Sequence, residues 1–188
     1  MTTPTAADEA QTTMLLTTFL RFAPVLTSAV GATYSYAFSV FFGGFRHPEM
    51  SPSAKWAAMP HWFRSVRAAS LRTIFGAYNS SIVVGGANAL LFWPSSSSTA
   101  ASVVGGPMSW SRSLYIAGTL LTVAYYLYTI TLRLVPLNFT LSDDKAAVAD
   151  RTVAETKLAR LDGRRTATTG VPAAVCFFVA AGLWGAGL

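Results

Sequence analysis

Four long stretches of the chain contain no Lys, Arg, Asp or Glu, and most of their residues are apolar. They cover residues 22–45, 73–111, 113–132 and 166–188. A helix rises about 1.5 Å per residue, so roughly 20 apolar residues cross the hydrocarbon core of a bilayer. Each stretch can therefore supply one crossing, and the pattern predicts an integral membrane protein with four spans.

The four stretches favour membrane helices over the strands of a barrel. Backbone polar groups in lipid must be satisfied internally, which restricts spanning segments to helices and closed barrels. Barrel strands alternate apolar and polar positions over about ten residues, whereas these stretches are longer and do not alternate. Pro24 suits the first turn of the first span. We expect an all-α fold, a membrane four-helix bundle in a single domain over residues 1–188, with spans at about 22–45, 74–93, 114–132 and 171–188.

A fifth helix is expected between the third and fourth spans. Ser142 suits an N-cap, Asp143 and Asp144 would lie in the first turn, and Gly163 suits the position after the end. These signals predict an amphipathic helix over about 143–161. It would lie on the cytoplasmic side, against the membrane surface or the end of the bundle.

The basic residues predict the orientation. Twelve of the fourteen Lys and Arg residues lie in the segments 46–72 and 133–165, and only Arg21 and Arg112 lie elsewhere. Both segments face the same side of a four-span chain, and basic loops usually stay in the cytoplasm. We therefore expect both termini on the lumenal or external side.

The net charge of +6 is then a topology signal, with an attraction to the anionic lipids of the bilayer. Nucleic acid is not an expected partner, because no basic and aromatic recognition module accompanies the charge.

Two pairs of polar residues lie deep in the expected spans. Asn79 and Asn88 belong to the second span, and we expect both to face the bundle interior. They would either bond one helix to another or line a polar substrate pocket. Tyr125 and Tyr126 in the third span are too deep for an interfacial belt and need internal partners.

No motif for a metal or a cofactor stands out. The chain has no glycine loop for phosphates and no Cys–His metal spacing. His47, Glu49 and His61 contain the residue types of a two-histidine, one-carboxylate site. Pro48 and the irregular spacing favour ordinary residues near the membrane instead, so we expect neither a metal nor a cofactor.

The segments on either side of the fifth helix resemble a known family. After the third span the chain reads Val135-Pro136-Leu137-Asn138-Phe139-Thr140-Leu141, and a second stretch runs from Leu158 to Arg165. This arrangement resembles the anthrone-oxygenase-like family of small four-span membrane proteins. Its members tend to show Val-Pro-x-Asn-x-x-Leu after the third span and Trp-x-x-x-(Asn or His)-x-x-Arg before the fourth.

The resemblance covers about residues 22–188 in architecture, but its specific motif rests on few positions. The matches are Val135, Pro136, Asn138, Leu141 and Arg165, and Trp62 also falls where the family has a tryptophan. Leu158 replaces the family's second tryptophan, and Asp162 replaces its Asn or His.

The resemblance implies the oxidation of a polyketide anthrone to an anthraquinone by O2, without metal or flavin. A hydroxyanthrone has an acidic CH2 group, and its enolate can pass an electron to O2 unaided. The protein then needs an apolar slot, a base and donors for an oxyanion. Asp162 is the expected base, and Asn138 and Arg165 the expected oxyanion donors. A flat hydrophobic aromatic substrate would contact Trp62, Asn79, Tyr125 and Tyr126.

Other interpretations stay open. Arg165 can mark the membrane boundary, Asn138 can stabilise a turn, and Asp162 can be a partner of Arg165. The chain can then be a non-catalytic four-span scaffold, or an accessory subunit of a membrane complex or oligomer. Transport is less favoured, because no charged residue lies deep in a span. An enzyme should bring Asn138, Arg165 and Trp62 to one pocket, whereas a scaffold should have a filled interior.

Overall fold

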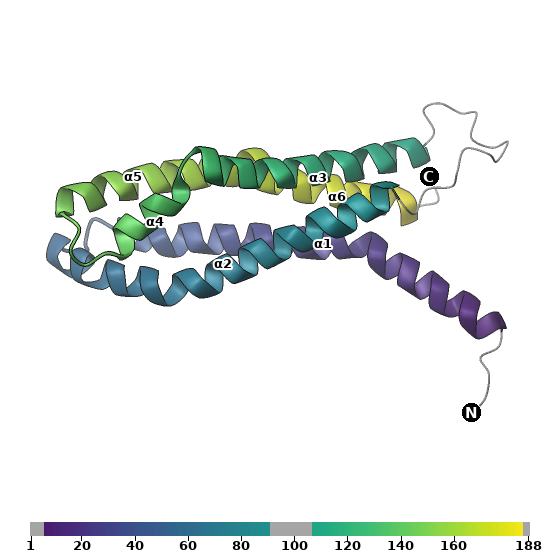
Figure 1. Ribbon diagram of the computed structural model, residues 1–188, viewed down its shortest axis with the longest axis horizontal. Helices are drawn as coiled ribbons and strands as arrows, with labels where there is room; N and C mark the ends of the chain where they lie inside the picture. The colour runs from purple at the N-terminus through teal and green to yellow at the C-terminus, as the bar shows by residue number, and fades with distance from the viewer. Residues whose placement is uncertain (1–5, 91–106, 186–188) are drawn as a thin grey trace.

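The computed structural model describes residues 6–90 and 107–185, and its regular structure in these ranges is entirely helical (Figure 1). This confirms the expected all-α fold. The elements are α1 (Ala6–Gly44), α2 (Pro52–Leu90), α3 (Pro107–Thr131), α4 (Leu134–Ser142), α5 (Val148–Arg165), the π-helical turn η1 (Thr166–Gly170) and α6 (Val171–Gly185).

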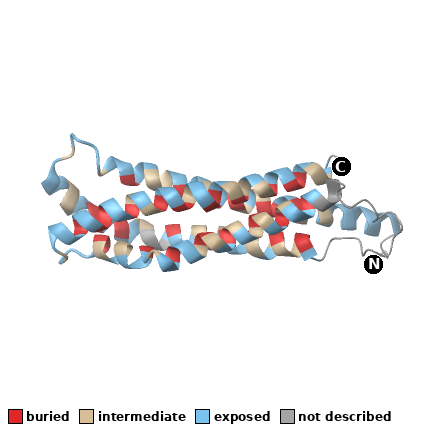
Figure 2. Cartoon of the chain, turned by 90° about the horizontal axis from the view of Figure 1, so that it is seen from above, coloured by how far each residue is buried: buried red, intermediate tan, exposed pale blue. Residues whose placement is uncertain are grey.

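Four helical columns lie side by side in an elongated bundle (Figure 1). The columns are α1, α2, the pair α3–α4 and the continuous run α5–η1–α6, and each runs antiparallel to the one before it. Buried residues gather on the faces that the columns turn toward one another (Figure 2). The connections α1–α2 and α4–α5 lie at the same end, which we call the basic end because Arg46, Lys55, Arg64, Lys145 and Arg151 lie there.

Three helical segments are long and apolar enough to cross a membrane, judged by length and composition. They are Ala6–Gly44, Trp110–Thr131 and Val148–Gly185. The expected spans 22–45, 114–132 and 171–188 largely coincide with parts of these segments. The expected span 74–93 is not among them: α2 includes residues 74–90 but has Arg72 just before them. Residues 91–93 and 186–188 lie outside the described ranges.

Pro24 lies in the interior of α1 rather than in its first turn, because α1 begins as early as Ala6. Proline has no backbone N–H, so the carbonyl of Leu20 loses its helical partner. Asn88 Nδ2 of α2 donates to this carbonyl at 2.7 Å, and Tyr115 Oη of α3 donates to the carbonyl of Arg21 at 2.8 Å. Side chains of two other helices thus satisfy the backbone at the proline. The N-terminal part of α1 turns away from the bundle (Figure 1).

The expectation that both asparagines of α2 face the interior is correct for Asn88 and wrong for Asn79. Asn88 is fully buried, whereas Asn79 is exposed on the outer surface. A separation of nine residues is about two and a half helical turns, which places the two side chains on opposite faces.

The predicted helix over 143–161 has both ends wrong. Ser142 is the last residue of α4, and its hydroxyl donates to the carbonyl of Phe139 instead of capping a new helix. α5 begins at Val148 and continues through Gly163. A single glycine costs a helix only about 1 kcal/mol, and Gly163 is exposed with nothing packed against it.

The turn η1 keeps the buried residues of the last column on one face of that column. Buried residues follow one another in steps of four from Arg165 through Thr169, Ala173 and Phe177 to Ala181. A regular helix has 3.6 residues per turn, so four such steps would rotate these residues away from the bundle. One wide π-helical turn takes up the extra residue, and both Arg165 and Phe177 therefore face inward.

Charged contacts hold the basic end together. Lys55 Nζ of α2 donates to Glu155 Oε2 of α5 at 2.5 Å, and Arg64 Nη1 donates to Asp144 Oδ2 at 2.7 Å. The hydrogen bond from Arg64 holds the pKa of the exposed Asp144 carboxyl below its ordinary value. These contacts fix α2 against the segment that carries α4 and α5.

The pairing of Asn88 with the proline can be tested by a double-mutant cycle. Asn88→Leu should destabilise the protein by about 1–3 kcal/mol, because it leaves the buried Leu20 carbonyl without a donor. In a Pro24→Ala background the restored N–H can donate to Leu20, so the same substitution should cost less. Thermal unfolding in detergent measures the coupling.

The matched control for this cycle is Asn79→Leu, which changes an exposed asparagine of the same helix and should have little effect. An equal cost of Asn88→Leu in the two backgrounds would contradict the pairing.

Candidate functional site

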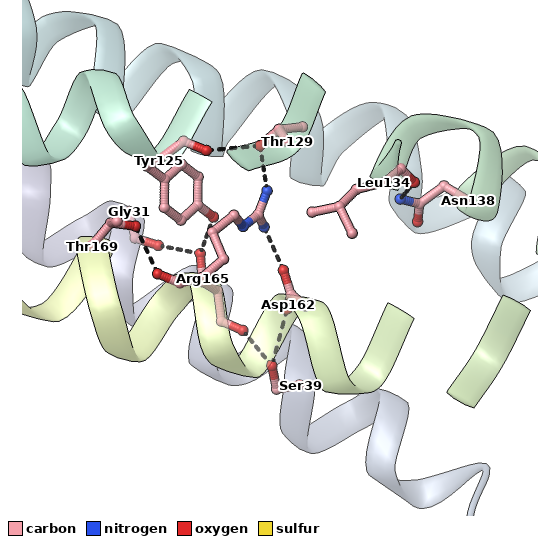
Figure 3. A network of polar contacts seen from close by, with 10 residues as sticks. Gly31, Ser39, Tyr125, Thr129, Leu134, Asn138, Asp162, Arg165 and Thr169 are labelled. Atoms are coloured by element: carbon pink, nitrogen blue, oxygen red, sulfur yellow. Dashed lines mark hydrogen bonds and ion pairs between the residues drawn. The ribbon is translucent and has the colours of Figure 1, made fainter. Parts of the chain in front are cut away.

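A buried ion pair between Arg165 and Asp162 lies at the end of α5, where the column passes into its apolar part. Arg165 Nη2 donates to Asp162 Oδ1, and both side chains are almost fully buried. Arg165 Nη1 also donates to Thr129 Oγ1 of α3 at 2.7 Å, and Ser39 Oγ of α1 donates to Asp162 Oδ2 at 3.2 Å. The network therefore joins three of the four columns (Figure 3).

The aromatic ring of Tyr125 supports the guanidinium group. Arg165 Cζ lies 4.0 Å from the centre of this ring, within the range of a cation–π interaction. Tyr125 Oη shares a hydrogen bond of 3.0 Å with Ser35 Oγ of α1, and the ring of Tyr78 packs 4.3 Å from the ring of Tyr125. The position of the arginine is thus fixed by contacts on several sides.

Two glycines allow this close packing. A Cβ atom at Gly31 of α1 would come within 2.9 Å of the Tyr78 ring, and one at Gly170 of η1 would come within 2.9 Å of Tyr78 Oη. Real side chains do not approach so closely. Glycine at both positions therefore lets Tyr78 reach the centre of the bundle beside Tyr125.

The ion pair borders a cavity with a volume of about 60 Å³. An engineered apolar cavity of about 150 Å³ admits benzene, so the cavity as it stands is too small for a molecule of three fused rings. We call it the Arg165 cavity. Its polar lining residues are Ser35, Ser70, Tyr125, Thr129, Asn138, Asp162 and Arg165, and its apolar ones include Phe38, Phe63, Leu134 and Leu158.

Two polar atoms of the cavity lining have no hydrogen-bond partner within the described residues. They are Arg165 Nε and Ser70 Oγ, and both are buried. Native structures leave few buried polar atoms without partners. Each of these two groups can donate a hydrogen bond to an oxygen atom that comes within reach in the cavity.

Asn138 reaches the cavity from α4. Arg133 has a left-handed backbone (φ 52°), which separates α3 from α4. The segment 135–141, which carries the resemblance, lies within the short helix α4. Asn138 Nδ2 donates to the Leu134 carbonyl at 2.9 Å. Its amide has a second N–H, which this bond does not use.

The structure brings together four of the seven residues that the sequence singles out: Asn138, Asp162, Arg165 and Tyr125 all line the Arg165 cavity. Tyr126 turns toward α2, where its hydroxyl donates to the Phe75 carbonyl at 3.0 Å. Trp62 packs against Phe38 and lines a neighbouring groove. Trp62, Tyr126 and the exposed Asn79 are thus not part of the cavity lining.

Sequence reasoning missed the hydroxyl residues that complete the network. The missed residues are Ser35, Ser39 and Thr129: Ser35 and Ser39 lie four residues apart in α1, and Thr129 lies four residues after the predicted Tyr125 in α3. Residues at this spacing share one face of a helix. Pairs of polar groups on a single face of an apolar helix were therefore the available signal.

The described residues contain no group of three or more His, Cys, Asp or Glu side chains that can hold a metal ion. His47 lies near Glu49, at 3.8 Å, and both are exposed. His61 instead shares a hydrogen bond with Arg64. The two histidines and the carboxylate do not form a common site.

No protein-family model matches the chain, and neither a curated protein nor a solved structure is significantly similar to it. The function is therefore inferred from the site.

The stability of the protein should fall more when one residue of the ion pair is replaced than when both are replaced. Arg165→Met should destabilise the protein by about 3–5 kcal/mol, because it leaves Asp162 buried without its cation. Arg165→Met combined with Asp162→Leu removes both charges and should restore most of the lost stability. Unfolding in detergent measures both effects.

Arg164→Met is the control, since Arg164 is the exposed neighbour on the same helix and should change stability by no more than about 0.5 kcal/mol. A double variant as unstable as the single variant would show that the two charges are not coupled.

Proposed function

We propose that the protein is a membrane enzyme that oxidises a hydroxylated anthrone to an anthraquinone with O2, using neither metal nor flavin. The observation that supports it most is the convergence of Arg165, Asp162 and Asn138 on one cavity between apolar helices. Of the three residues whose convergence is expected of an enzyme, Asn138 and Arg165 line this cavity, whereas Trp62 lines the neighbouring groove.

The reaction converts the CH2 group of the anthrone to a carbonyl group. Removal of one proton gives an enolate, which passes an electron to O2. The resulting carbon radical and superoxide combine to a peroxide anion, which takes back the first proton to give the hydroperoxide. Loss of the second proton from carbon then breaks the O–O bond and releases water. One O2 is consumed per quinone and one water is formed, and the substrate supplies all the electrons.

The residues of the cavity match the needs of this reaction. The unpaired Arg165 Nε and the second amide hydrogen of Asn138 are donors for the enolate oxygen. Asp162 is the carboxylate that receives the proton, and its bond from Ser39 keeps it in place. The surrounding apolar side chains exclude water, which strengthens the interaction between Arg165 and an oxyanion.

The proposal also includes a topology with four membrane spans. We take α2 as the fourth span because it is as long as α1 and lies in the same bundle. The two basic segments are then cytoplasmic and both termini are lumenal or external. A hydrophobic substrate can reach the bundle from the lipid, and the Arg165 cavity lies near the cytoplasmic boundary.

The topology can be measured with single cysteines in a Cys176→Ala background. His47→Cys and Asp143→Cys should react with an impermeant maleimide on the cytoplasmic side of oriented vesicles. Thr12→Cys, in the first part of α1, should react only from the opposite side. Labelling of all three from one side would contradict the four-span arrangement.

A second candidate function is supported by the same network. The bonds among Ser39, Asp162, Arg165 and Thr129 hold three columns together. They would stabilise a non-catalytic scaffold or an accessory subunit of a membrane complex equally well. Activity measurements on a folded variant distinguish the two functions.

The purified protein should accelerate the oxidation of emodin anthrone in air, followed by quinone absorbance and by O2 uptake in a one-to-one ratio. The variant Arg165→Met with Asp162→Leu should retain its fold and lose at least about 100-fold in rate, as expected for loss of an oxyanion donor.

Arg164→Met should keep the full rate. No acceleration by the unmodified protein would favour the scaffold, and full activity in the double variant would remove the ion pair from the mechanism.

A further inference from the structure

A second concave surface lies beside the Arg165 cavity, between α1 and α2. We call it the aromatic groove. Its volume is about 330 Å³, and its lining includes Tyr34, Phe38, Phe41, Trp62, Val66 and Ser70. This volume falls within the range of about 300–1,000 Å³ that is usual for small-molecule sites, whereas the Arg165 cavity is far smaller.

Phe38 and Ser70 line both the groove and the cavity, so they form the partition between them. The Phe38 ring lies 5.4 Å from the ring of Trp62 and 6.0 Å from that of Phe63. On the opposite helix, Ser70 is 3% exposed, and its hydroxyl has no hydrogen-bond partner within the described residues. The partition is thus one aromatic ring and one unused hydroxyl.

We propose that the aromatic groove binds a planar, hydroxylated, fused-ring molecule, with its rings against Trp62 and one of its oxygen atoms on Ser70. Displacement of Phe38 then lets the reacting edge of this molecule reach Arg165. The ligand class rests on the proposed function, while the site itself rests on the groove and on Ser70.

Three features of the groove fit this ligand. Its lining includes the aromatic side chains of Tyr34, Phe38, Phe41 and Trp62, and aromatic rings pack favourably against fused rings. Ser70 offers the hydrogen bond that a phenol or a quinone oxygen can accept or share. Phe38 and Ser70 separate the groove from the cavity, so with Phe38 displaced only the reacting edge of the molecule has to enter the smaller space.

Binding can be tested with emodin, a stable hydroxyanthraquinone that needs no oxidation, by quenching of tryptophan fluorescence in detergent. Ser70→Ala should weaken binding by about 3- to 10-fold, the loss expected for one neutral hydrogen bond. The same variant should unfold at an unchanged or higher temperature without ligand, because the lost hydroxyl has no partner to leave behind.

Ser65→Ala is the matched control. Ser65 is an exposed serine of the same helix, its hydroxyl donates to the Trp62 carbonyl, and its loss should leave emodin affinity unchanged.

The outcomes separate this inference from the proposed function. Absence of emodin binding, equal affinity in Ser70→Ala, or loss of its fold would overturn the inference. Equally strong competition by a long-chain fatty acid would overturn it too, because the groove would then hold a lipid chain. Emodin binding that depends on Ser70, without anthrone oxidation, would leave the groove as a binding site and reject the enzyme.

Discussion

The buried ion pair of Arg165 and Asp162 is the constraint around which the bundle is arranged. Two charges between apolar helices are stable only when each has good partners. Thr129 of α3 and Ser39 of α1 supply these partners, and the Tyr125 ring covers the guanidinium group. The turn η1 then brings the rest of the last column back into register, so that α6 buries its own apolar stripe.

The same network leaves an opening for chemistry. Arg165 Nε and Ser70 Oγ are buried without hydrogen-bond partners within the described residues. Both atoms belong to the lining of one cavity, and Ser70 also borders the aromatic groove. Polar donors and a flat apolar surface therefore meet at one partition. This combination suits a hydrophobic molecule that carries a reactive oxygen at one edge.

The helical class and the approximate positions of the apolar segments could be predicted, because unpaired charges are expelled from long apolar helices. The meeting of Asp162 with Arg165 was accessible too, since residues three apart share a helix face. The outward position of Asn79 follows from its separation from Asn88.

Other features depend on contacts between helices and could not be predicted. They are the position of Pro24 inside α1, the turn η1 and the separation of Trp62 from the cavity. Asn88 replaces the missing N–H of Pro24, for instance, and no local signal marks this substitution.

The central claim is that Arg165 supplies an open donor to an anionic oxygen of a bound aromatic molecule. The visible spectrum of bound emodin tests it directly, because the phenol and its anion absorb at different wavelengths. Both complexes are measured at one pH below the pKa that the phenol has in detergent. A larger fraction of emodin should be anionic when it is bound to the unmodified protein than when it is bound to the variant Arg165→Met with Asp162→Leu. Identical spectra in the two complexes would contradict the account.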